Sequence, residues 1–198
     1  MGDLFGIIAF LFRQTMFFAI PLLIVALGGL FCERSGVVNV ALDGIMIMGA
    51  FASIFFINQM QDVMSGQLLL ILAILVAAAA GMLFSLLHAY AAINMKSNQV
   101  ISGTALNMLA PAFAIYVARS VQENGVQQIT FNNTFRIDAV PVLSDIPILG
   151  DLFFKDCYIT TFIGFAILIV SVIVLYKTRF GLRLRACGEH PQAADSVG

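Results

Sequence analysis

The stretch "ILAILVAAAAG", residues 71–81, contains no polar side chain and lies inside a run from Val63 to Met95 that lacks Asp, Glu, Lys and Arg. A run of this length exceeds the ~20 residues that a helix needs to cross the ~30 Å hydrocarbon core of a bilayer. In lipid such a segment must be helical, because an unpaired backbone group there costs several kcal/mol. Its small residues favour close packing against a neighbouring helix. The stretch therefore predicts a membrane-spanning helix.

Four other uncharged runs extend this pattern along the chain. The 198 residues are 61% hydrophobic and 11% charged, whereas an ordinary soluble domain has about 25% charged residues. Buried helices of a soluble core are excluded, because these runs have no polar face. The net charge of −1 gives no basic field that would attract nucleic acid. The chain is expected to be an all-α polytopic helical bundle with spans at about 14–31, 44–60, 67–91, 100–118 and 158–176.

Basic residues in short loops predict the orientation of these spans. Lys177, Arg179, Arg183 and Arg185 follow the last span, and an excess of Lys and Arg marks the cytoplasmic side. Residues 177–198 are therefore expected in the cytoplasm, and the loop 119–157 and the N-terminus outside. Arg13 disagrees with this rule but is a single residue against a cluster. Cys32 and Cys187 then lie inside and Cys157 outside, so no disulfide is expected.

Two segments at predicted cytoplasmic helix ends, 33–44 and 94–107, mix polar and apolar residues. Each is a candidate for a short re-entrant piece, because irregular backbone survives at membrane depth where it lines a cavity. The alternative is helix capping or hydrogen bonding between helices, with Asn39 or Asp43 capping the second span and Ser97 or Asn98 capping the fourth. The candidates for lining such a cavity, which would form the path of a transporter, are Asn39, Asp43, Asn98, Gln99 and Asn107.

The predicted outer loop, 119–157, is long for a connection between helices. Its part "AVPVLSDIPILGDLFF", residues 139–154, alternates Pro, Asp and apolar residues. This pattern predicts an ordered cap with a short interfacial helix. Such a cap would dock an extracellular partner or simply cover helix ends.

No catalytic or metal-binding constellation is visible in the sequence. There is no Gly-rich phosphate loop, no nucleophile elbow, and no His/Cys cluster with metal-ligand spacing. His88 stands alone and is expected to be structural. An ion-coupled carrier usually places ionisable residues at mid-membrane, and the predicted spans contain no Asp, Glu, Lys or Arg. Energy for transport is therefore expected to come from elsewhere.

The end of the chain, "GEHPQAADSVG" at 188–198, is polar and rich in small residues. Pro191 suits the first turn of a helix, and the residues after it are good or neutral helix formers. The segment is expected to form a short cytoplasmic helix whose small residues let another protein approach closely. Composition alone leaves a solvated loop nearly as probable.

The string "QAADSVG" resembles the E-A-A-x-x-x-G cytoplasmic motif of bacterial ABC-importer permeases, with Gln192 in place of Glu. The longer string "TRFGLRLRACGEHPQAADSVG", 178–198, is similar to the T-x-x-G-x-x-x-R-A-x-G-x-N-P-x-A-A-x-x-x-G pattern of branched-chain amino acid and ribose type permeases, with His190 in place of Asn. "ERSGVVNVALDGIMIMGAF", 33–51, resembles the nucleoside or simple-sugar branch, with Asp43 where Glu is commoner. "NQVISGTALNMLA", 98–110, and "LSDIPILG", 143–150, also resemble that branch.

This resemblance implies a transport subunit and not an enzyme. Two permeases would pair in the bacterial plasma membrane, and an extracellular binding protein would deliver the substrate. Separate ATPase subunits would hold ATP–Mg, so this chain itself would bind no cofactor. The chain, residues 1–198, resembles the N-terminal part of the permease domain and would not transport alone. The expected ATPase-coupling residues are Gly188, Glu189, Pro191, Gln192, Ala193, Ala194 and Gly198.

A nucleoside is the substrate that the resemblance favours, followed by simple sugars and then by branched-chain amino acids, which a related ABC permease would carry. The alternatives from other classes are an ion-coupled secondary carrier and a membrane scaffold or intramembrane enzyme. A secondary carrier would lose uptake with a protonophore and be indifferent to ATP.

Overall fold

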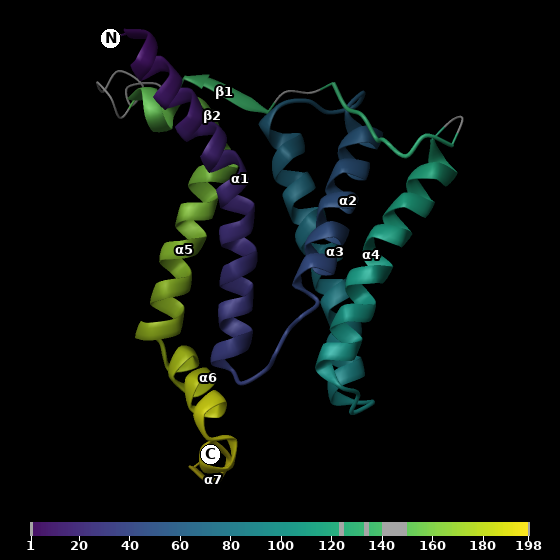
Figure 1. The fold of residues 1–198 in the computed structure, drawn as a ribbon, viewed down its shortest axis with the longest axis vertical. Helices are drawn as coiled ribbons and strands as arrows, with labels where there is room; N and C mark the ends of the chain where they lie inside the picture. The colour runs from purple at the N-terminus through teal and green to yellow at the C-terminus, as the bar shows by residue number, and fades with distance from the viewer. Residues whose placement is uncertain (1, 123–124, 133–134, 140–149, 198) are drawn as a thin grey trace. The chain divides into compact units, whose positions relative to one another are not determined.

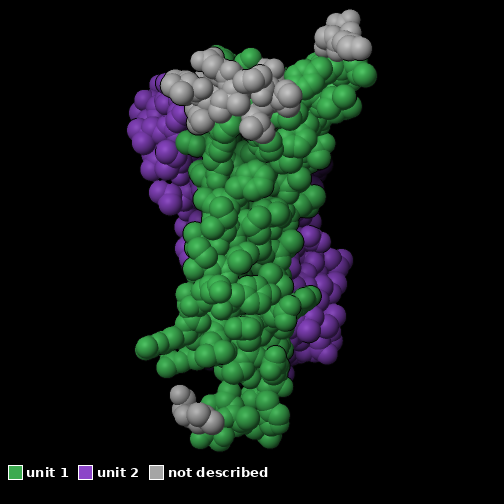
Figure 2. All heavy atoms as spheres, turned by 90° about the vertical axis from the view of Figure 1, so that its left-hand side faces the viewer, with its two compact units in different colours: residues 1–37, 135–198 green, residues 38–134 purple. Residues whose placement is uncertain are grey.

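The computed structural model describes residues 2–122, 125–132, 135–139 and 150–197. These residues form two compact units, coloured separately in Figure 2. Unit 1 combines the chain up to residue 37 with the chain from residue 135 onward, and unit 2 contains residues 38–134. Each unit is therefore held together by its own contacts.

Unit 1 is built on two long helices, α1 (Gly2–Arg34) and α5 (Ile159–Lys177), which pack side by side. Near the N-terminus, a two-stranded antiparallel ribbon of β1 (Arg136–Ala139) and β2 (Lys155–Tyr158) and a π-helical turn, η3 (Gly150–Phe154), lie beside them (Figure 1). The short helices α6 (Arg179–Glu189) and α7 (Pro191–Val197) continue from the other end of α5. The two ends of unit 1 thus carry different structures.

Unit 2 contains the helices α2 (Leu42–Met60), α3 (Gln67–Ile93) and α4 (Gln99–Val121). Small residues allow close approach, since Gly49 of α2 lies against the Ala77 carbonyl of α3. The part of the outer loop in this unit is tied to the end of α2, where the Asn58 amide donates to the Thr130 carbonyl at 2.7 Å and Gln61 accepts from the Asn132 N–H at 3.0 Å. This part of the loop is ordered against the helix bundle.

Large apolar side chains are exposed along the long helices, and the buried core is small. Among the described residues, five helices are long and apolar enough to cross a membrane: Leu4–Arg34 within α1, and the full lengths of α2, α3, α4 and α5. Such a surface is unfavourable in water and suits lipid or partner helices. The predicted all-α polytopic fold is confirmed.

The sequence analysis did not foresee two features, the extension of α1 before residue 14 and the ribbon of β1 and β2 with η3. Helix α1 begins at Gly2, well before the predicted span at 14, so Arg13 lies inside a continuous helix. Its guanidinium is 3.1 Å from the carboxylate of Asp156, which compensates the charge. The described end of the outer loop forms the β1–β2 ribbon and η3. Residues 140–149, which include most of "LSDIPILG", lie outside the described residues.

His88 is the buried polar residue of unit 2, with 6% of its surface exposed. Its Nδ1 lies 3.0 Å from the Ser102 hydroxyl, which links α3 to α4, and its Nε2 has no hydrogen-bond partner among the described residues. Among the described residues, the Ser102 hydroxyl is therefore the hydrogen-bond partner of one of the two ring nitrogens, and the other has none.

Replacing Ser102 by Ala should lower the free energy of unfolding by about 1–3 kcal/mol, because both ring nitrogens of His88 would then be buried without a partner. Thermal unfolding of the purified membrane protein measures this loss. Ser85→Ala is the matched control, since the Ser85 hydroxyl bonds only to the Met82 carbonyl of its own helix and is exposed. Equal unfolding temperatures for the two variants would contradict the role assigned to the His88–Ser102 pair.

Candidate functional site

The junction between α5 and α6 is fixed by one threonine. The Thr178 hydroxyl donates to the Val174 carbonyl at 2.5 Å and accepts from the Gly181 N–H at 3.2 Å, so it closes α5 and caps α6. Arg185 adds a second tie, because its guanidinium lies 5.3 Å from the centre of the Tyr176 ring. The Thr, Gly and Arg positions of the 178–198 pattern thus hold α6 against the end of α5.

Helix α1 ends in a Schellman motif within "ERSG". The Gly36 N–H donates to the Glu33 carbonyl at 3.0 Å, and the Val37 N–H donates to the Cys32 carbonyl at 3.1 Å. Gly36 has a φ of +80°, a left-handed conformation that glycine adopts without steric cost. The glycine of this sequence motif therefore ends the helix.

Gly188 of α6 packs directly on this helix end. A Cβ atom at Gly188 would overlap the Arg34 carbonyl oxygen and lie 3.0 Å from the Gly36 nitrogen, and a Cβ atom at Gly36 would lie 3.2 Å from the Gly188 Cα. The two backbones meet with no room for a side chain between them. The contact joins α1 to the last turn of α6, immediately before α7.

Helix α7 begins at Pro191, as the sequence predicts. The His190 Nδ1 accepts from the Ala193 N–H at 3.2 Å, and the Ala194 N–H donates to the His190 carbonyl at 3.1 Å. Asparagine is a preferred residue at such a helix start because its side chain accepts the same kind of bond. His190 therefore keeps the capping function of the residue that the family pattern has here.

The expected coupling residues lie together on this end of unit 1. Glu189, Pro191, Gln192 and Ala193 are exposed, and Gly188 and Ala194 are half-buried. Gly198 lies outside the described residues. Their coupling role stays a prediction. The arrangement presents a short helix with little side-chain bulk next to the α1–α6 contact.

A second set of polar residues holds segment 38–44 to α4 in unit 2. The Asn107 amide donates to the Val40 carbonyl at 2.7 Å and accepts from the Gly44 N–H at 2.7 Å, so one side chain bridges both sides of the turn into α2. Gln99 accepts from the Val38 N–H at 3.2 Å. These bonds bring together two sequence motifs that lie far apart along the chain.

The remaining candidates for the transport path are used at helix starts or are exposed. Asn98 caps α4 by accepting from the N–H groups of Val100 and Ile101 at 2.9 and 3.4 Å. Asn39 accepts from the Ala41 N–H at 3.0 Å in a local turn. The alternative that Asp43 is the N-cap of α2 is wrong, because Ala41 has that position and Asp43 is exposed in the first turn. A path-lining role for the five candidates stays a prediction.

The contact between Gly36 and Gly188 was not foreseen from the sequence, although both glycines stand in motifs that the sequence analysis singled out. The sequence feature that could have indicated the contact is a glycine near a helix end in each of the two motifs. The described part of the chain contains no group of three or more His, Cys, Asp or Glu side chains placed to hold a metal ion.

Residues 11–198 match the family model described as the branched-chain amino acid transport system / permease component. The chain is 43% identical over 99% of its length to the guanosine ABC transporter permease protein NupQ of Bacillus subtilis, and 43% identical over 93% of its length to the nucleoside ABC transporter permease protein NupC of Lactococcus lactis. It is 34% identical over 95% of its length to the putative glucose ABC transporter permease protein TsgC13 of Haloferax volcanii.

The chain spans 61%, 57% and 54% of the lengths of these three relatives, respectively. No solved structure is significantly similar to it. The match to the family model covers nearly the whole chain, including the helix ends and the α6–α7 segment described above. The chain belongs to the family of branched-chain amino acid transport system permease components.

Proposed function

We propose that this chain is part of the membrane-spanning permease subunit of an ATP-driven importer. The relatives named above support this proposal, because two are nucleoside or guanosine ABC permeases and one is a putative glucose ABC permease. A nucleoside is the favoured substrate and a simple sugar the second, delivered by an extracellular binding protein. In this proposal the permease works with a second permease subunit.

The observation that carries the proposal is the position of α7 next to the contact between Gly188 and the end of α1. In the proposed mechanism a groove of the ATPase subunit holds α7, whose exposed residues are small or uncharged apart from Asp195. ATP–Mg bound by that partner would close two ATPase subunits and move α7. This chain contributes the docking helix and no catalytic group.

A displacement of α7 would reach two spans through rigid local contacts. Thr178 ties α6 to α5, and Gly188 ties α6 to α1. Because both ties involve backbone groups, α6 has little freedom to move without α1 and α5. The permease would then change between inward-open and outward-open states that its partners favour differently. The path-lining residues of unit 2 remain part of this proposal.

Replacing Ala194 by Arg should release the ATPase subunit from membranes and abolish uptake, because a long charged side chain would fill the space between α7 and the groove. Ala194→Ser is the control, because serine is also small. This variant should keep both ATPase binding and uptake. Uptake of radiolabelled nucleoside and co-purification of the ATPase measure the two effects. Unchanged ATPase binding and uptake in Ala194→Arg would show that α7 is not the coupling helix.

Replacing Gly188 by Val should reduce uptake severalfold while the ATPase stays bound, because the new side chain separates α6 from α1 but leaves the surface of α7 intact. Cys187→Val places the same side chain at the exposed neighbouring position and should transport normally. The same uptake and co-purification assays apply. Normal uptake in Gly188→Val, or loss of the ATPase as well, would refute transmission through this contact.

The proposed orientation can be tested with single-cysteine variants and a membrane-impermeant maleimide. Cys187 is exposed on α6 and should react only after the cells are permeabilised. A cysteine introduced by Val126→Cys, at a position that is 48% exposed in the outer loop, should react in intact cells. The opposite pattern would reverse the orientation.

Cys157 should react slowly from either side. It is 8% exposed, and burial, aided by the nearby Asp156 carboxylate, raises the pKa of its thiol above the ordinary value. Because the thiolate is the reactive form, its labelling should increase as the pH rises and reach the level of an exposed cysteine only at a more alkaline pH.

A further inference from the structure

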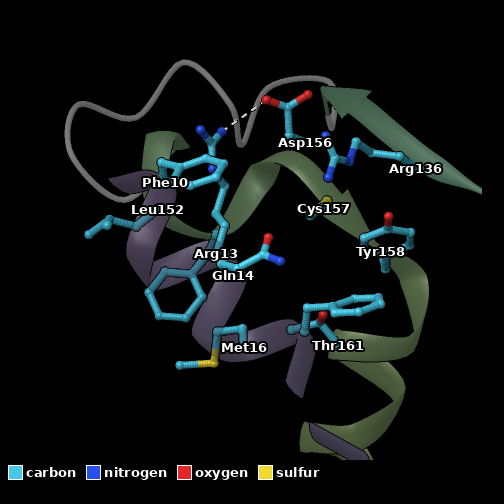
Figure 3. Close-up of a pocket in the computed structure, with 12 residues that line it drawn as sticks. Phe10, Arg13, Gln14, Met16, Arg136, Leu152, Asp156, Cys157, Tyr158 and Thr161 are labelled. Atoms are coloured by element: carbon cyan, nitrogen blue, oxygen red, sulfur yellow. Dashed lines mark hydrogen bonds and ion pairs between the residues drawn. The ribbon is translucent and has the colours of Figure 1, made fainter. Parts of the chain in front are cut away.

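A cavity of about 140 Å³ lies at the end of unit 1 where α1, α5, β1, β2 and η3 meet. We call it the arginine pocket. The polar side chains that line it include Arg13, Gln14, Arg136, Asp156, Tyr158 and Thr161. Figure 3 shows the side chains of Gln14, Arg136 and Tyr158 around the same space, with Arg13 turned toward Asp156. The residues come from four elements, so the pocket depends on the folded unit.

The charges in the pocket do not balance. Arg13 forms an ion pair with Asp156, with 3.1 Å between Nη1 and Oδ2. In the part of the chain that the structure describes, no carboxylate lies within ion-pair distance of Arg136. Among the described residues that line the cavity, two guanidinium groups stand against one carboxylate, an excess of one positive charge. This excess favours an anionic ligand.

Arg136 is held by an aromatic ring and donates no side-chain hydrogen bond to any residue that the structure describes. Its guanidinium carbon lies 5.6 Å from the centre of the Tyr158 ring, and Tyr158 is itself 5.4 Å from the Phe17 ring, centre to centre. A cation–π contact uses the face of the guanidinium, whereas its N–H groups lie in the plane and remain available for a phosphate or carboxylate. The Gln14 amide and the Thr161 hydroxyl are further donors on the same cavity.

The conformation of Asp156 is consistent with a built site. Its φ is +48°, in the left-handed region that aspartate tolerates better than most residues but still adopts infrequently. In this conformation the Asp156 carboxylate forms its ion pair with Arg13, and the Arg13 guanidinium is turned toward Asp156 (Figure 3). Backbone strain of this kind tends to be retained where a site requires it.

The pocket lies at the level where a membrane-spanning helix leaves the hydrocarbon. At 1.5 Å per residue, Arg13 and Arg34 are about 30 Å apart along α1, close to the ~30 Å thickness of the hydrocarbon core. Arg34 ends α1 at the other end of unit 1, so Arg13 falls at the opposite boundary. Helix α5 begins at Ile159, next to the pocket residue Tyr158.

Apolar side chains flank the polar residues on the same face of α1. Phe10 and Phe17 are one helical turn before and after the pair Arg13–Gln14, and such spacing places all four on one side of a helix. Phe10 is 58% and Phe17 48% exposed within this chain, and both line the cavity. A ligand that combines an anionic group with hydrocarbon matches this arrangement.

We infer that the arginine pocket binds the phosphate of an anionic phospholipid at the membrane surface, with the acyl chains outside the cavity along α1. The volume suits this reading, because a cavity of ~150 Å³ holds one benzene molecule and is thus too small for a whole lipid or a whole nucleoside. A nucleoside is also uncharged and would leave Arg136 without a counter-ion. The inference does not rest on the proposed transport function or on the orientation, since either leaflet can supply the lipid.

The test uses the full-length permease that contains this chain, assembled with its partners and reconstituted in phosphatidylcholine nanodiscs. Phosphatidylglycerol is titrated in, and bound lipid is counted by native mass spectrometry. Arg136→Gln should weaken phosphatidylglycerol binding about tenfold or more, which is the usual loss for one charged hydrogen bond. Thr161→Val, which changes no charge, should weaken it by a smaller factor.

Arg183→Gln is the matched control, because it removes an exposed arginine from the other end of unit 1 and should leave phosphatidylglycerol binding unchanged. The unfolding temperature in phosphatidylcholine alone should be the same for all variants, and Arg136→Lys, which keeps the charge, should bind more lipid than Arg136→Gln. An equal loss in Arg136→Gln and Arg183→Gln would reduce the effect to nonspecific surface charge and overturn the inference.

Two further arms separate the lipid from other anions. Soluble glycerol 3-phosphate should not displace phosphatidylglycerol at equal concentration, and displacement would assign the pocket to a soluble phosphate. The substrate-binding protein should dock equally well to wild type and Arg136→Gln. If docking is lost while lipid binding is intact, the pocket holds an acidic side chain of that protein and the lipid inference is wrong.

Discussion

The absence of water in the hydrocarbon core constrains this structure more than any single contact. Because every backbone group there must be paired within the protein, the five spans are helices, and unpaired N–H and C=O groups arise only where helices end. Several polar residues of the chain lie at these ends. Asn98, Thr178 and His190 cap helix starts, and Gly36 ends α1. The family motifs therefore coincide with helix ends for a physical reason.

The fold class and the number of spans could be predicted from the sequence because they depend on long uncharged runs, which need no partner to be recognised. The bounds of α1 could not. The uncharged run after Arg13 predicts only where the membrane span begins, and the helix continues past that point because the residues before it also favour helix. Arg13 remains inside α1 because Asp156, 143 positions later, compensates it, and sequence spacing does not reveal such a partner.

The candidate site shows the same division between local and distant information. The start of α7 at Pro191 and the cap by Asn98 are local and were predicted. The bridge of Asn107 to Val40 and Gly44 and the packing of Gly188 on Gly36 join segments far apart in sequence. Their residue types are consistent with several roles, so the sequence left capping, interhelical bonding and path lining open. Only the fold decides which backbone groups these side chains meet.

Glycine at both 36 and 188 makes α6 a rigid connection and not a hinge. A contact through long side chains would absorb a displacement by changing rotamers, whereas two backbones in van der Waals contact move together. Thr178 has the same effect at the other end of α6, since its hydroxyl bonds to backbone groups on both sides of the junction. In the proposed mechanism, a helix held by backbone contacts at both ends would transmit motion with little loss. Such a helix is what a permease would need between a docking segment in water and the spans in lipid.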